Sequence, residues 1–487
     1  MASAKDKSLK TKAFAGLVWS AIEKISTQGG QFVISIFLAR LLMPEDYGMI
    51  GMLSIFIAIS QSLIDSGMGT GLIQKKNRTD IDFSTVFVFN FFVSIAIYFL
   101  LFVSAPFIAD FYNMPKLVIL TRILTLNIIV NSFAIIQRTR LVISIDFKNI
   151  AKINVVSFFC GGCLGIVSAY NGFGVWALVI MTLSKTIITV VMLWFLNRWS
   201  PSFQFSKQSF KEIFGFGSKL LIAGLYAQIF NNAYNIVIGK VYSASQLGFY
   251  AKTKSIAETA AGTITGVFYQ VTYPILTSLK DDQQRLLFVF RRFVRMSAFL
   301  VFPMMTILSL IAEPLITLIL TEKWIPVVPL LQWMYFARIF YPLSSINMNI
   351  LNAIGRSDLF LKLDLSKAPL IILALVITIP LGVKAMVIGH VVTSFLAFLM
   401  NSYLSGRLFG YGPLQQFRDI LKIILATIGM AFTVFVCSNG IESDVLKLFY
   451  GIVSGTASYL LFAFFLRIPE LDEVKQTAIK IYNRCFC

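Results

Sequence analysis

Long apolar segments alternate with short polar ones along the whole of this chain. A helix needs about 20 apolar residues to cross a hydrocarbon core of about 30 Å, and segments of that length recur here with only brief interruptions. The pattern predicts fourteen membrane-spanning helices. These are 13–42, 47–72, 83–109, 117–136, 153–170, 175–196, 213–238, 251–275, 293–320, 329–353, 368–382, 385–404, 420–437 and 447–466.

The composition agrees with this pattern. Of the 487 residues, 57% are hydrophobic and only 13% are charged, and the mean hydropathy is +0.79. These values exclude a soluble globular protein of ordinary composition, and no soluble domain of useful size fits between the apolar segments. The predicted fold class is an all-α polytopic membrane protein.

The distribution of basic residues predicts the orientation of the chain. Both tails, and the loops that an even number of helices places on their side, hold most of the 42 Lys and Arg residues. The opposite loops hold only Lys116, Lys240, Lys323 and Lys384. Positive residues accumulate on the cytoplasmic side of membrane proteins, so both termini are expected in the cytoplasm. This placement accounts for the net charge of +19 without a nucleic-acid partner.

A weak internal repeat indicates two related halves. RLLMPEDYG at residues 40–48 aligns with KVYSASQLG at residues 240–248, and the basic residue and the glycine keep the same separation. Transporters built from two repeats commonly bind their substrate between them. We therefore expect two six-helix bundles around a central cavity, 13–200 and 201–404, followed by two further helices in 405–466, with cytoplasmic tails at 1–12 and 467–487.

Several predicted spans carry polar side chains at helical spacing. A charge at the bilayer centre costs about 2.5–3.5 kcal/mol even on a lenient scale, so these stripes should face the protein interior or water. The stripe of the first span consists of Ser20, Glu23, Lys24, Thr27, Gln28, Gln31 and Ser35. The others consist of Ser54, Gln61 and Asp65; Gln228, Asn231, Asn232 and Asn235; Lys252, Ser255, Thr259, Thr263 and Gln270; and Arg338, Tyr341, Ser345, Asn349 and Asn352.

Hydrogen bonding between helices is the alternative explanation for the stripes, and for a single Ser, Thr or Asn it is the more common one. Charged residues favour a binding site, because a buried cation without a matching acid requires an anionic ligand or water. The candidates of this kind are Lys24, Lys219, Lys252 and Arg338.

Other charged residues have simpler interpretations. Lys254 and Glu258 have the i, i+4 spacing at which they can pair with each other. Arg291, Arg292 and Arg295 lie near a cytoplasmic end, where snorkelling of a long side chain to the interface explains them.

The chain contains no motif for a cofactor. It lacks a G-x-x-x-x-G-K-[ST] segment that would bind the phosphates of ATP, so transport would draw on a proton or sodium gradient or on consumption of the substrate. His390 is the only histidine, and Cys160 and Cys163 lie inside a span, so no metal site is expected. Asp80 and Asp82 form the D-x-D of some glycosyltransferases, but they lie in a short basic loop and are interpreted as solvated.

Three segments near the start of the chain have a recognisable pattern: FAGLVWS at 14–20, LARLLMPEDYG at 38–48 and GTGLIQKK at 69–76. Together with LGFYA at 247–251, EKWIPVVP at 322–329 and LNAIGRSD at 351–358, they resemble the bacterial polysaccharide transporter family of lipid-linked oligosaccharide flippases. That family belongs to the multidrug/oligosaccharidyl-lipid/polysaccharide exporter superfamily. The resemblance covers most of the chain and fades over the last two spans.

The resemblance implies a flippase of the bacterial cytoplasmic (inner) membrane. It would translocate an undecaprenyl-pyrophosphate-linked oligosaccharide repeat unit from the inner to the outer leaflet by alternating access, for lipopolysaccharide, capsule or exopolysaccharide synthesis. Basic side chains would hold the diphosphate, because charge-assisted hydrogen bonds to phosphate are strong, and amides and hydroxyls would bind the sugars. The expected substrate-binding residues are Lys24, Lys219, Lys252, Arg338, Gln28, Gln31, Asn231, Asn232, Asn235, Tyr341 and Asn349. The acids available for ion coupling are Asp65, Glu23 and Glu258.

Two other functions stay open on the sequence. A drug or metabolite antiporter of the multidrug and toxin extrusion type should have an acidic cavity, whereas buried Lys residues outnumber buried acids here. A surface-glycan polymerase or ligase should have a substantial external domain, whereas the longest external loop is 239–250. The expected partners are the polyprenyl-pyrophosphate-linked oligosaccharide, membrane lipids and the glycan polymerase machinery, and the chain is expected to act as a monomer without cofactors.

Overall fold

The computed structural model describes the backbone of residues 2–486, and the side chains in that range except at 2–18, 21, 219, 263, 264, 267, 269, 477, 478 and 480–486. Every regular element in this range is a helix. The elements are α1 (Ala2–Leu41), α2 (Pro44–Asp65), α3 (Met68–Gln74), α4 (Asp80–Phe111), α5 (Leu117–Leu124), α6 (Leu126–Ile143), α7 (Phe147–Tyr170), α8 (Val175–Asn197), α9 (Lys207–Val241), α10 (Ala244–Ser278), α11 (Gln283–Leu310), α12 (Ala312–Ile319), η1 (Glu322–Trp324), α13 (Val327–Ala353), α14 (Ser357–Ser366), α15 (Ala368–Thr378), η2 (Ile379–Leu381), α16 (Val383–Phe409), α17 (Pro413–Ser438), α18 (Asp444–Phe465) and α19 (Pro469–Phe486).

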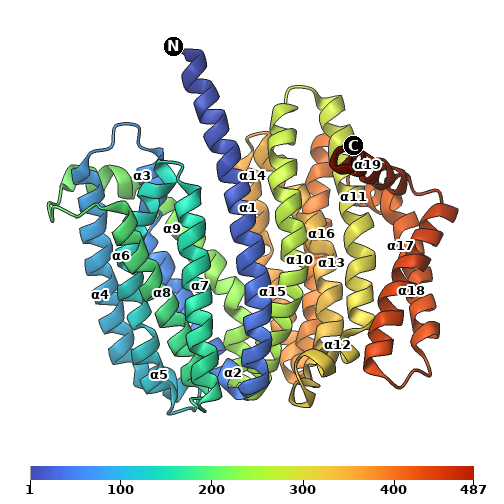
Figure 1. Cartoon of the computed structure of the whole chain (residues 1–487), viewed down its shortest axis with the longest axis horizontal. Coiled ribbons are helices and arrows are strands. Elements are labelled where there is room, and N and C mark those ends of the chain that lie inside the picture. Colours follow the sequence, from blue (N-terminus) through green and yellow to red (C-terminus); the bar gives the residue numbers. More distant parts are fainter. Residues whose placement is uncertain (1, 487) are drawn as a thin grey trace. The chain divides into compact units, whose positions relative to one another are not determined.

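The chain divides into two compact units, Met1–Gly248 and Phe249–Cys487. Figure 1 shows the helices of the first unit in blue to green and those of the second in yellow to red. Helix α10 begins in the first unit and continues in the second. The bundle boundaries expected from the sequence stay a prediction.

Nine helical segments within residues 2–486 are long and apolar enough to cross a membrane. They coincide with nine of the predicted spans, from Pro44–Gln74, which combines α2 and α3, to Asp444–Phe465, which is α18. Helix α9 is a tenth if its parts Lys207–Ser218 and Leu220–Val241 are joined across a 40° bend. Helices α1, α10 and α13, on which polar stripes lie, are not among the nine. The all-α polytopic fold is confirmed, and the number fourteen stays a prediction.

Aromatic side chains hold α4, α6 and α8 together in the first unit. The ring of Phe87 on α4 meets Phe133 on α6 and Trp194 on α8 edge to face, at centroid distances of 5.9 and 6.2 Å. Such pairs stabilise a core beyond the apolar area they bury. The indole N–H of Trp194 donates to the backbone carbonyl of Phe133 at 3.0 Å, so its polar atom is satisfied as well.

Two glycines of the internal repeat meet where α2 and α10 begin. A Cβ atom at Gly48 would lie 1.8 Å from the carbonyl oxygen of Ala244, and one at Gly248 would lie 1.8 Å from that of Pro44. The contact is reciprocal, because each helix places its glycine against the first residue of the other. Glycine lets two backbones approach this closely because it has no Cβ. The repeat found in the sequence therefore forms a packing contact in the first unit.

The second predicted span is broken between α2 and α3. Ser66 and Gly67 have φ angles of 45° and 64°, a region that glycine enters without strain. A Cβ at Gly67 would lie 2.7 Å from the carbonyl oxygen of Gly217 on α9, so the break also brings two backbones together. As a result, Asp65 is the last residue of a helix in the middle of an apolar segment.

The loop after α3 is tied to two helices by Lys75. Its ammonium lies 3.0 Å from Asp82 on α4 and 3.0 Å from Glu212 on α9. Burial disfavours the charged ammonium, but hydrogen bonds to these two carboxylates outweigh it and raise the pKa of Lys75. The carboxylate of Asp82 also accepts a hydrogen bond from the backbone N–H of Thr79, and the backbone N–H of Asp82 donates to the hydroxyl of Thr79. These two bonds cap α4. Asp82 is thus a buried structural residue, and its interpretation as part of a solvated D-x-D loop is wrong.

A buried polar contact joins α13 to α17 in the second unit. The Nδ2 of Asn347 donates to the Oε1 of Gln416 at 3.0 Å, and the Nε2 of Gln416 donates to the Oδ1 of Asn347 at 2.9 Å. Both side chains are fully buried, so these bonds replace the water that the interior excludes.

Three arginines of α11 hold two C-terminal helices of the second unit. Ion pairing explains the position of these arginines better than snorkelling does, because each of them forms an ion pair with an acid that is distant in the sequence. The pairs are Arg291 with Asp419 on α17 at 2.9 Å, Arg292 with Glu473 on α19 at 2.9 Å, and Arg295 with Glu470 on α19 at 2.8 Å.

Replacing Gly48 or Gly248 with alanine should destabilise the protein, because the added Cβ would collide with a backbone carbonyl that no rotamer change can move. We expect the free energy of unfolding to fall by about 1–3 kcal/mol or more, seen as a lower thermal midpoint in detergent. Gly215 on α9 is the matched control, because a Cβ there meets no atom within 4 Å. Gly215→Ala should be neutral or stabilising, and an equal loss at all three positions would contradict the contact.

Asp419→Asn should also lower the thermal midpoint, because Arg291 would lose the charge of a carboxylate whose side chain is only 14% exposed. The expected loss is about 1–3 kcal/mol, and the double variant Arg291→Gln/Asp419→Asn should recover part of it. The control is Arg285→Gln, which breaks an exposed pair with Asp282 at 3.6 Å and should change little. Additive effects of the two changes at Arg291 and Asp419 would show that the pair does not stabilise the fold.

Candidate functional site

The polar stripe of α1 contributes to contacts within the first unit. Asn154 of α7 donates from Nδ2 to the carboxylate of Glu23 at 2.6 Å, and the hydroxyl of Thr27 donates to the backbone carbonyl of Glu23 at 2.7 Å. Lys24 is partly buried, and Gln31 is exposed. Glu23 therefore connects α1 with α7, whereas Lys24 and Gln31 are accessible to a ligand.

The stripe of α9 faces α2 at two of its asparagines. The hydroxyl of Ser54 on α2 donates to Oδ1 of Asn232 at 3.3 Å, and Nδ2 of Asn235 donates to that hydroxyl at 3.2 Å. Asn232 also donates to the backbone carbonyl of Gln228 at 2.9 Å. These bonds match the alternative of interhelical hydrogen bonding, while Asn231 is exposed. The side chain of Lys219, another predicted substrate ligand, lies outside the described residues.

An ion pair with a buried base joins α10 and α13 in the second unit. The guanidinium of Arg338 donates to the carboxylate of Glu258 at 2.7 Å. The Arg338 side chain is 11% exposed and that of Glu258 is 47% exposed, so the acid is far more accessible than the base. The Nε of Arg338 is buried and has no hydrogen-bond partner among the described atoms. Arg338 therefore keeps an unused donor for an anionic ligand.

Further basic groups lie on α10 and α16. Lys252 is only 4% exposed, and its ammonium lies 5.8 Å from the ring centroid of Trp324, a geometry that stabilises a buried cation. Lys254 and His390 are both close enough to Arg338 to interact with it electrostatically. The region is therefore basic, and its acid Glu258 is in direct contact with Arg338.

A cavity of about 320 Å³ lies along α13, and its lining begins two residues after Arg338, at Phe340. The ring of Tyr341 lies 5.8 Å from the guanidinium carbon of Arg338 and also lines the cavity. Asn349 lines it too, and donates to the hydroxyl of Thr272 at 3.3 Å. Asn401 of α16 is 1% exposed, and its carbonyl oxygen has no hydrogen-bond partner among the described atoms. Two predicted sugar ligands, Tyr341 and Asn349, thus share one polar cavity.

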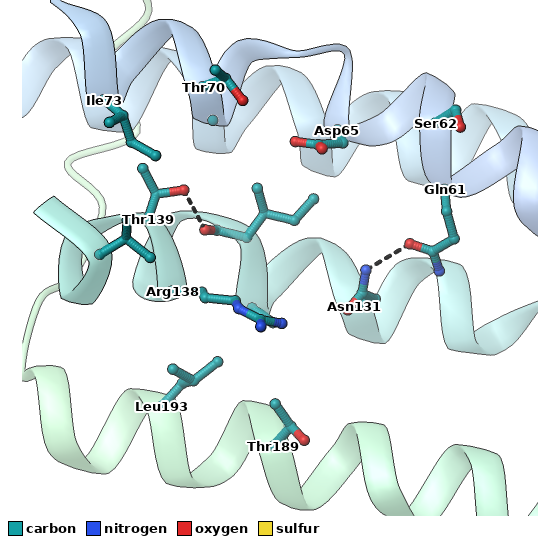
Figure 2. A pocket seen from close by; sticks show the side chains of 14 residues that line it. Gln61, Ser62, Asp65, Thr70, Ile73, Asn131, Arg138, Thr139, Thr189 and Leu193 are labelled. Carbon is teal, nitrogen blue, oxygen red and sulfur yellow. Dashed lines mark hydrogen bonds between the residues drawn. The ribbon is translucent and has the colours of Figure 1, made fainter. Parts of the chain in front are cut away.

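Asp65 lies in a different cavity, in the first unit. This space of about 470 Å³ is lined by α2, α3, α6 and α8, and Figure 2 shows Asp65 and Arg138 among its side chains. Asn131 of α6 donates to the amide oxygen of Gln61 of α2 at 2.7 Å across it. Of the three acids expected to couple ions, Glu23 and Glu258 have polar partners, and Asp65 forms no ion pair among the described side chains.

No group of three or more His, Cys, Asp or Glu side chains in the described part of the chain could hold a metal ion. The arrangement offers basic groups, amides and hydroxyls, which are the donors and acceptors that bind phosphates and sugars.

Residues 37–329 match a protein family described as "Polysaccharide biosynthesis protein". The chain belongs to this family. The match covers more than half of the sequence and includes most of the segments that carry the resemblance found in the sequence, which is thereby confirmed.

Curated relatives of this polysaccharide biosynthesis family member include three proteins of surface-glycan synthesis. The chain is 25% identical to teichuronic acid biosynthesis protein TuaB of Bacillus subtilis (strain 168), over 97% of the chain and 99% of the relative. It is 23% identical to lipopolysaccharide biosynthesis protein WzxC of Escherichia coli (strain K12), over 82% and 81%. It is also 23% identical to succinoglycan biosynthesis transport protein ExoT of Rhizobium meliloti (strain 1021), over 63% and 62%.

Solved structures show the same fold. The lipid II flippase MurJ, in an inward closed conformation, superposes with a TM-score of 0.74 at 15% identity, over 93% of this chain and 99% of that one. An inward-facing multidrug resistance MATE family transporter of the MOP superfamily superposes with a TM-score of 0.64 at 16% identity, over 81% and 97%. This family member is therefore an integral membrane protein with the fold of that superfamily.

Sequence reasoning did not assign Arg138 and Asn401 to a site. The predicted span 117–136 ends two residues before Arg138, whereas α6 continues to Ile143. Asn131 and Arg138 are seven residues apart, which is two helical turns, so the spacing could have placed them on one face. Asn401 gave no comparable signal, because its neighbours in the cavity come from distant helices.

Proposed function

We propose that this protein is a flippase for an undecaprenyl-pyrophosphate-linked oligosaccharide. It would carry the repeat unit from the inner to the outer leaflet of the bacterial cytoplasmic membrane by alternating access, with both termini in the cytoplasm. The observation that carries the proposal is the buried guanidinium of Arg338, whose Nε has no hydrogen-bond partner among the described atoms and whose neighbour Tyr341 lines a polar cavity. Membership of the family, the names of TuaB, WzxC and ExoT, and the likeness of fold to a lipid II flippase support it.

In this proposal the diphosphate binds to Arg338 and Lys252. A diphosphate carries negative charge that two buried cations would stabilise strongly, because the surroundings have a low dielectric constant. Tyr341 and Asn349 would bind sugar hydroxyls in the adjoining cavity. The remaining candidates from the sequence keep the same proposed roles: Lys24 and Lys219 as diphosphate ligands, and Gln28, Gln31, Asn231, Asn232 and Asn235 as sugar ligands.

Glu258 provides a means of coupling to a proton or sodium gradient. As long as its carboxylate is charged, it competes with the diphosphate for Arg338. A proton or a sodium ion on Glu258 would remove this competition and leave the guanidinium to the substrate. Glu258 is half exposed, so an ion can reach it from water. Glu23, held by Asn154, is a second candidate for coupling.

We propose transport without enzymatic activity and without a cofactor. The Asp82 of the D-x-D is bonded to Lys75 and to the cap of α4, so it has no free carboxylate to hold a metal-bound nucleotide sugar. The basic region around Arg338 favours an anionic substrate over the cationic drugs of an extrusion antiporter. The proposed partners are the lipid-linked oligosaccharide, membrane lipids and a glycan polymerase, and the proposed oligomeric state is a monomer.

Arg338→Gln and Lys252→Gln should each reduce export of the surface glycan, because each removes one charge-assisted contact to the diphosphate. A loss of about 1.5–3 kcal/mol weakens binding roughly 10- to 150-fold. Arg338→Lys should retain partial function, because positive charge matters before the fork geometry. The measurement is complementation of a deletion strain, with the protein quantified in the membrane and lipid-linked intermediates determined by mass spectrometry.

Lys362→Gln is the matched control, because Lys362 is an exposed base of the same unit. Arg338→Gln/Glu258→Gln separates folding from binding, since it removes the ion pair without leaving a lone charge. Equal loss of export in the control, or full export with Arg338→Gln, would remove the basis of the diphosphate site.

Glu258→Gln should bind inorganic pyrophosphate more tightly than the unmodified protein, because Arg338 no longer has a competing carboxylate. Glu313→Gln, at an exposed acid of α12, serves as the control. Calorimetry with inorganic pyrophosphate checks this, and equal affinities of Glu258→Gln and the unmodified protein would contradict the competition for Arg338.

A further inference from the structure

The cavity of the first unit has the size of a small-molecule site. Its volume of about 470 Å³ lies in the range of about 300–1,000 Å³ that ligand pockets occupy. Its walls come from α2, α3, α6 and α8, and the break after Asp65 gives α2 and α3 separate faces on it. Figure 2 shows its polar side chains on three separate ribbons.

The cavity contains one acid and one base that do not pair with each other. Asp65 and Arg138 both line it, and neither forms an ion pair with any side chain that the structure describes. A simple cation would be attracted by Asp65 and repelled by Arg138, and a simple anion would be attracted by Arg138 and repelled by Asp65. The pair of charges therefore favours a ligand that offers a hydrogen-bond donor to the carboxylate and an acceptor to the guanidinium.

The uncharged groups extend this pattern. Thr139 and Thr189 donate their hydroxyl protons to the backbone carbonyls of Ile135 and Lys185 at 2.8 and 2.9 Å, which leaves their oxygens as acceptors. The amides of Gln61 and Asn131 bond to each other and keep further donors and acceptors. Neutral hydroxyl groups, which both donate and accept, fit such a lining better than a second charged group does.

A glycine keeps the space between the acid and one hydroxyl open. A Cβ at Gly69 would lie 3.2 Å from the Oγ1 of Thr139 and 3.3 Å from an Oδ1 of Asp65. Both oxygens therefore approach the same point from two helices. Ile73 and Leu193 add apolar surface, against which the C–H face of a pyranose ring can lie.

We propose that this cavity binds one neutral sugar residue, with Asp65 accepting hydrogen bonds from its hydroxyls and Arg138 donating hydrogen bonds to them. The proposal rests on the proposed function for the source of the sugar, which is the translocated oligosaccharide. It assigns to the first unit the recognition of a sugar, a task separate from diphosphate binding by Arg338 and Lys252. Asp65 is then a sugar ligand and not a residue that couples ions.

The test uses the purified full-length chain in detergent and free ligands without a lipid carrier. Saturation-transfer NMR and calorimetry would measure binding of glucose, galactose, rhamnose and N-acetylglucosamine at millimolar concentration. Sodium chloride, inorganic phosphate and phosphoethanolamine are the comparison ligands for a cation, an anion and a zwitterionic headgroup. We expect at least one neutral sugar to bind, with none of the three comparison ligands displacing it.

Asp65→Asn and Arg138→Gln should each weaken sugar binding about tenfold or more, because each removes a charge-assisted hydrogen bond. Gly69→Ala fills the space between Thr139 and Asp65 without removing a charge, so it should weaken binding even if the other two variants fold poorly. Lys76→Gln, at an exposed base of the same unit, should bind like the unmodified protein. Thermal unfolding of each variant shows whether it is folded.

Several results would overturn the proposal. These are no binding of any sugar, binding of phosphate or phosphoethanolamine in its place, sodium binding that depends on Asp65, or sugar binding that all three cavity variants leave intact. A chain that binds sugar here but does not flip a lipid-linked substrate would contradict only the proposed function. A chain that flips but binds no sugar would contradict only this inference.

Discussion

The cost of holding charge in a hydrocarbon solvent is the constraint on which the rest of this structure depends. Backbone groups in a bilayer are satisfied within helices, but side-chain charges must find partners from other helices. Glu23 of α1 meets Asn154 of α7 in the first unit, and Arg338 of α13 meets Glu258 of α10 in the second. Each contact fixes the rotation of two helices, because a helix turned away from its partner would expose the polar group to lipid.

The same constraint makes the Arg338 region suitable for transport. A fully buried ion pair is hard to separate, because each charge would be left without a partner in a medium of low dielectric constant. Here the base is buried while the acid is half exposed, so the pair can open on the side of Glu258. An anionic substrate can then replace the carboxylate without leaving the guanidinium uncompensated. The contact that holds α10 to α13 in the absence of substrate is, in this account, the contact that the substrate exchanges.

Local sequence patterns allowed much of this architecture to be predicted, whereas contacts between residues far apart in the sequence could not be predicted. Apolar length located nine spans, and helical spacing placed Tyr341 and Asn349 on one face of α13, where both line a cavity. The repeat predicted that Gly48 and Gly248 are equivalent, though not that each lies against the other's helix. The partner of Arg291 could not be predicted, because Asp419 is 128 residues away and no spacing rule links residues so far apart.

Helix ends and helix breaks were the other difficulty. Hydropathy marks where apolar residues stop, but α6 continues beyond that point as far as Ile143, so the predicted span 117–136 did not include Arg138. Hydropathy also does not detect the helix break at Ser66 and Gly67, where the backbone leaves the helical conformation and separates α2 from α3. Both errors concern one cavity, which is why the sequence predicted Asp65 alone and not the site around it.

The central claim, that the chain moves a lipid-linked diphosphate oligosaccharide between leaflets, is tested most directly in liposomes. The purified chain would be reconstituted with a polyprenyl-diphosphate-linked saccharide, and a membrane-impermeant glycosidase would be added outside. The account predicts that the fraction of substrate cleaved rises from the outer-leaflet share toward completion in vesicles that contain the protein. Cleavage that stops at the same fraction with and without the protein, at either direction of an imposed proton or sodium gradient, would contradict it.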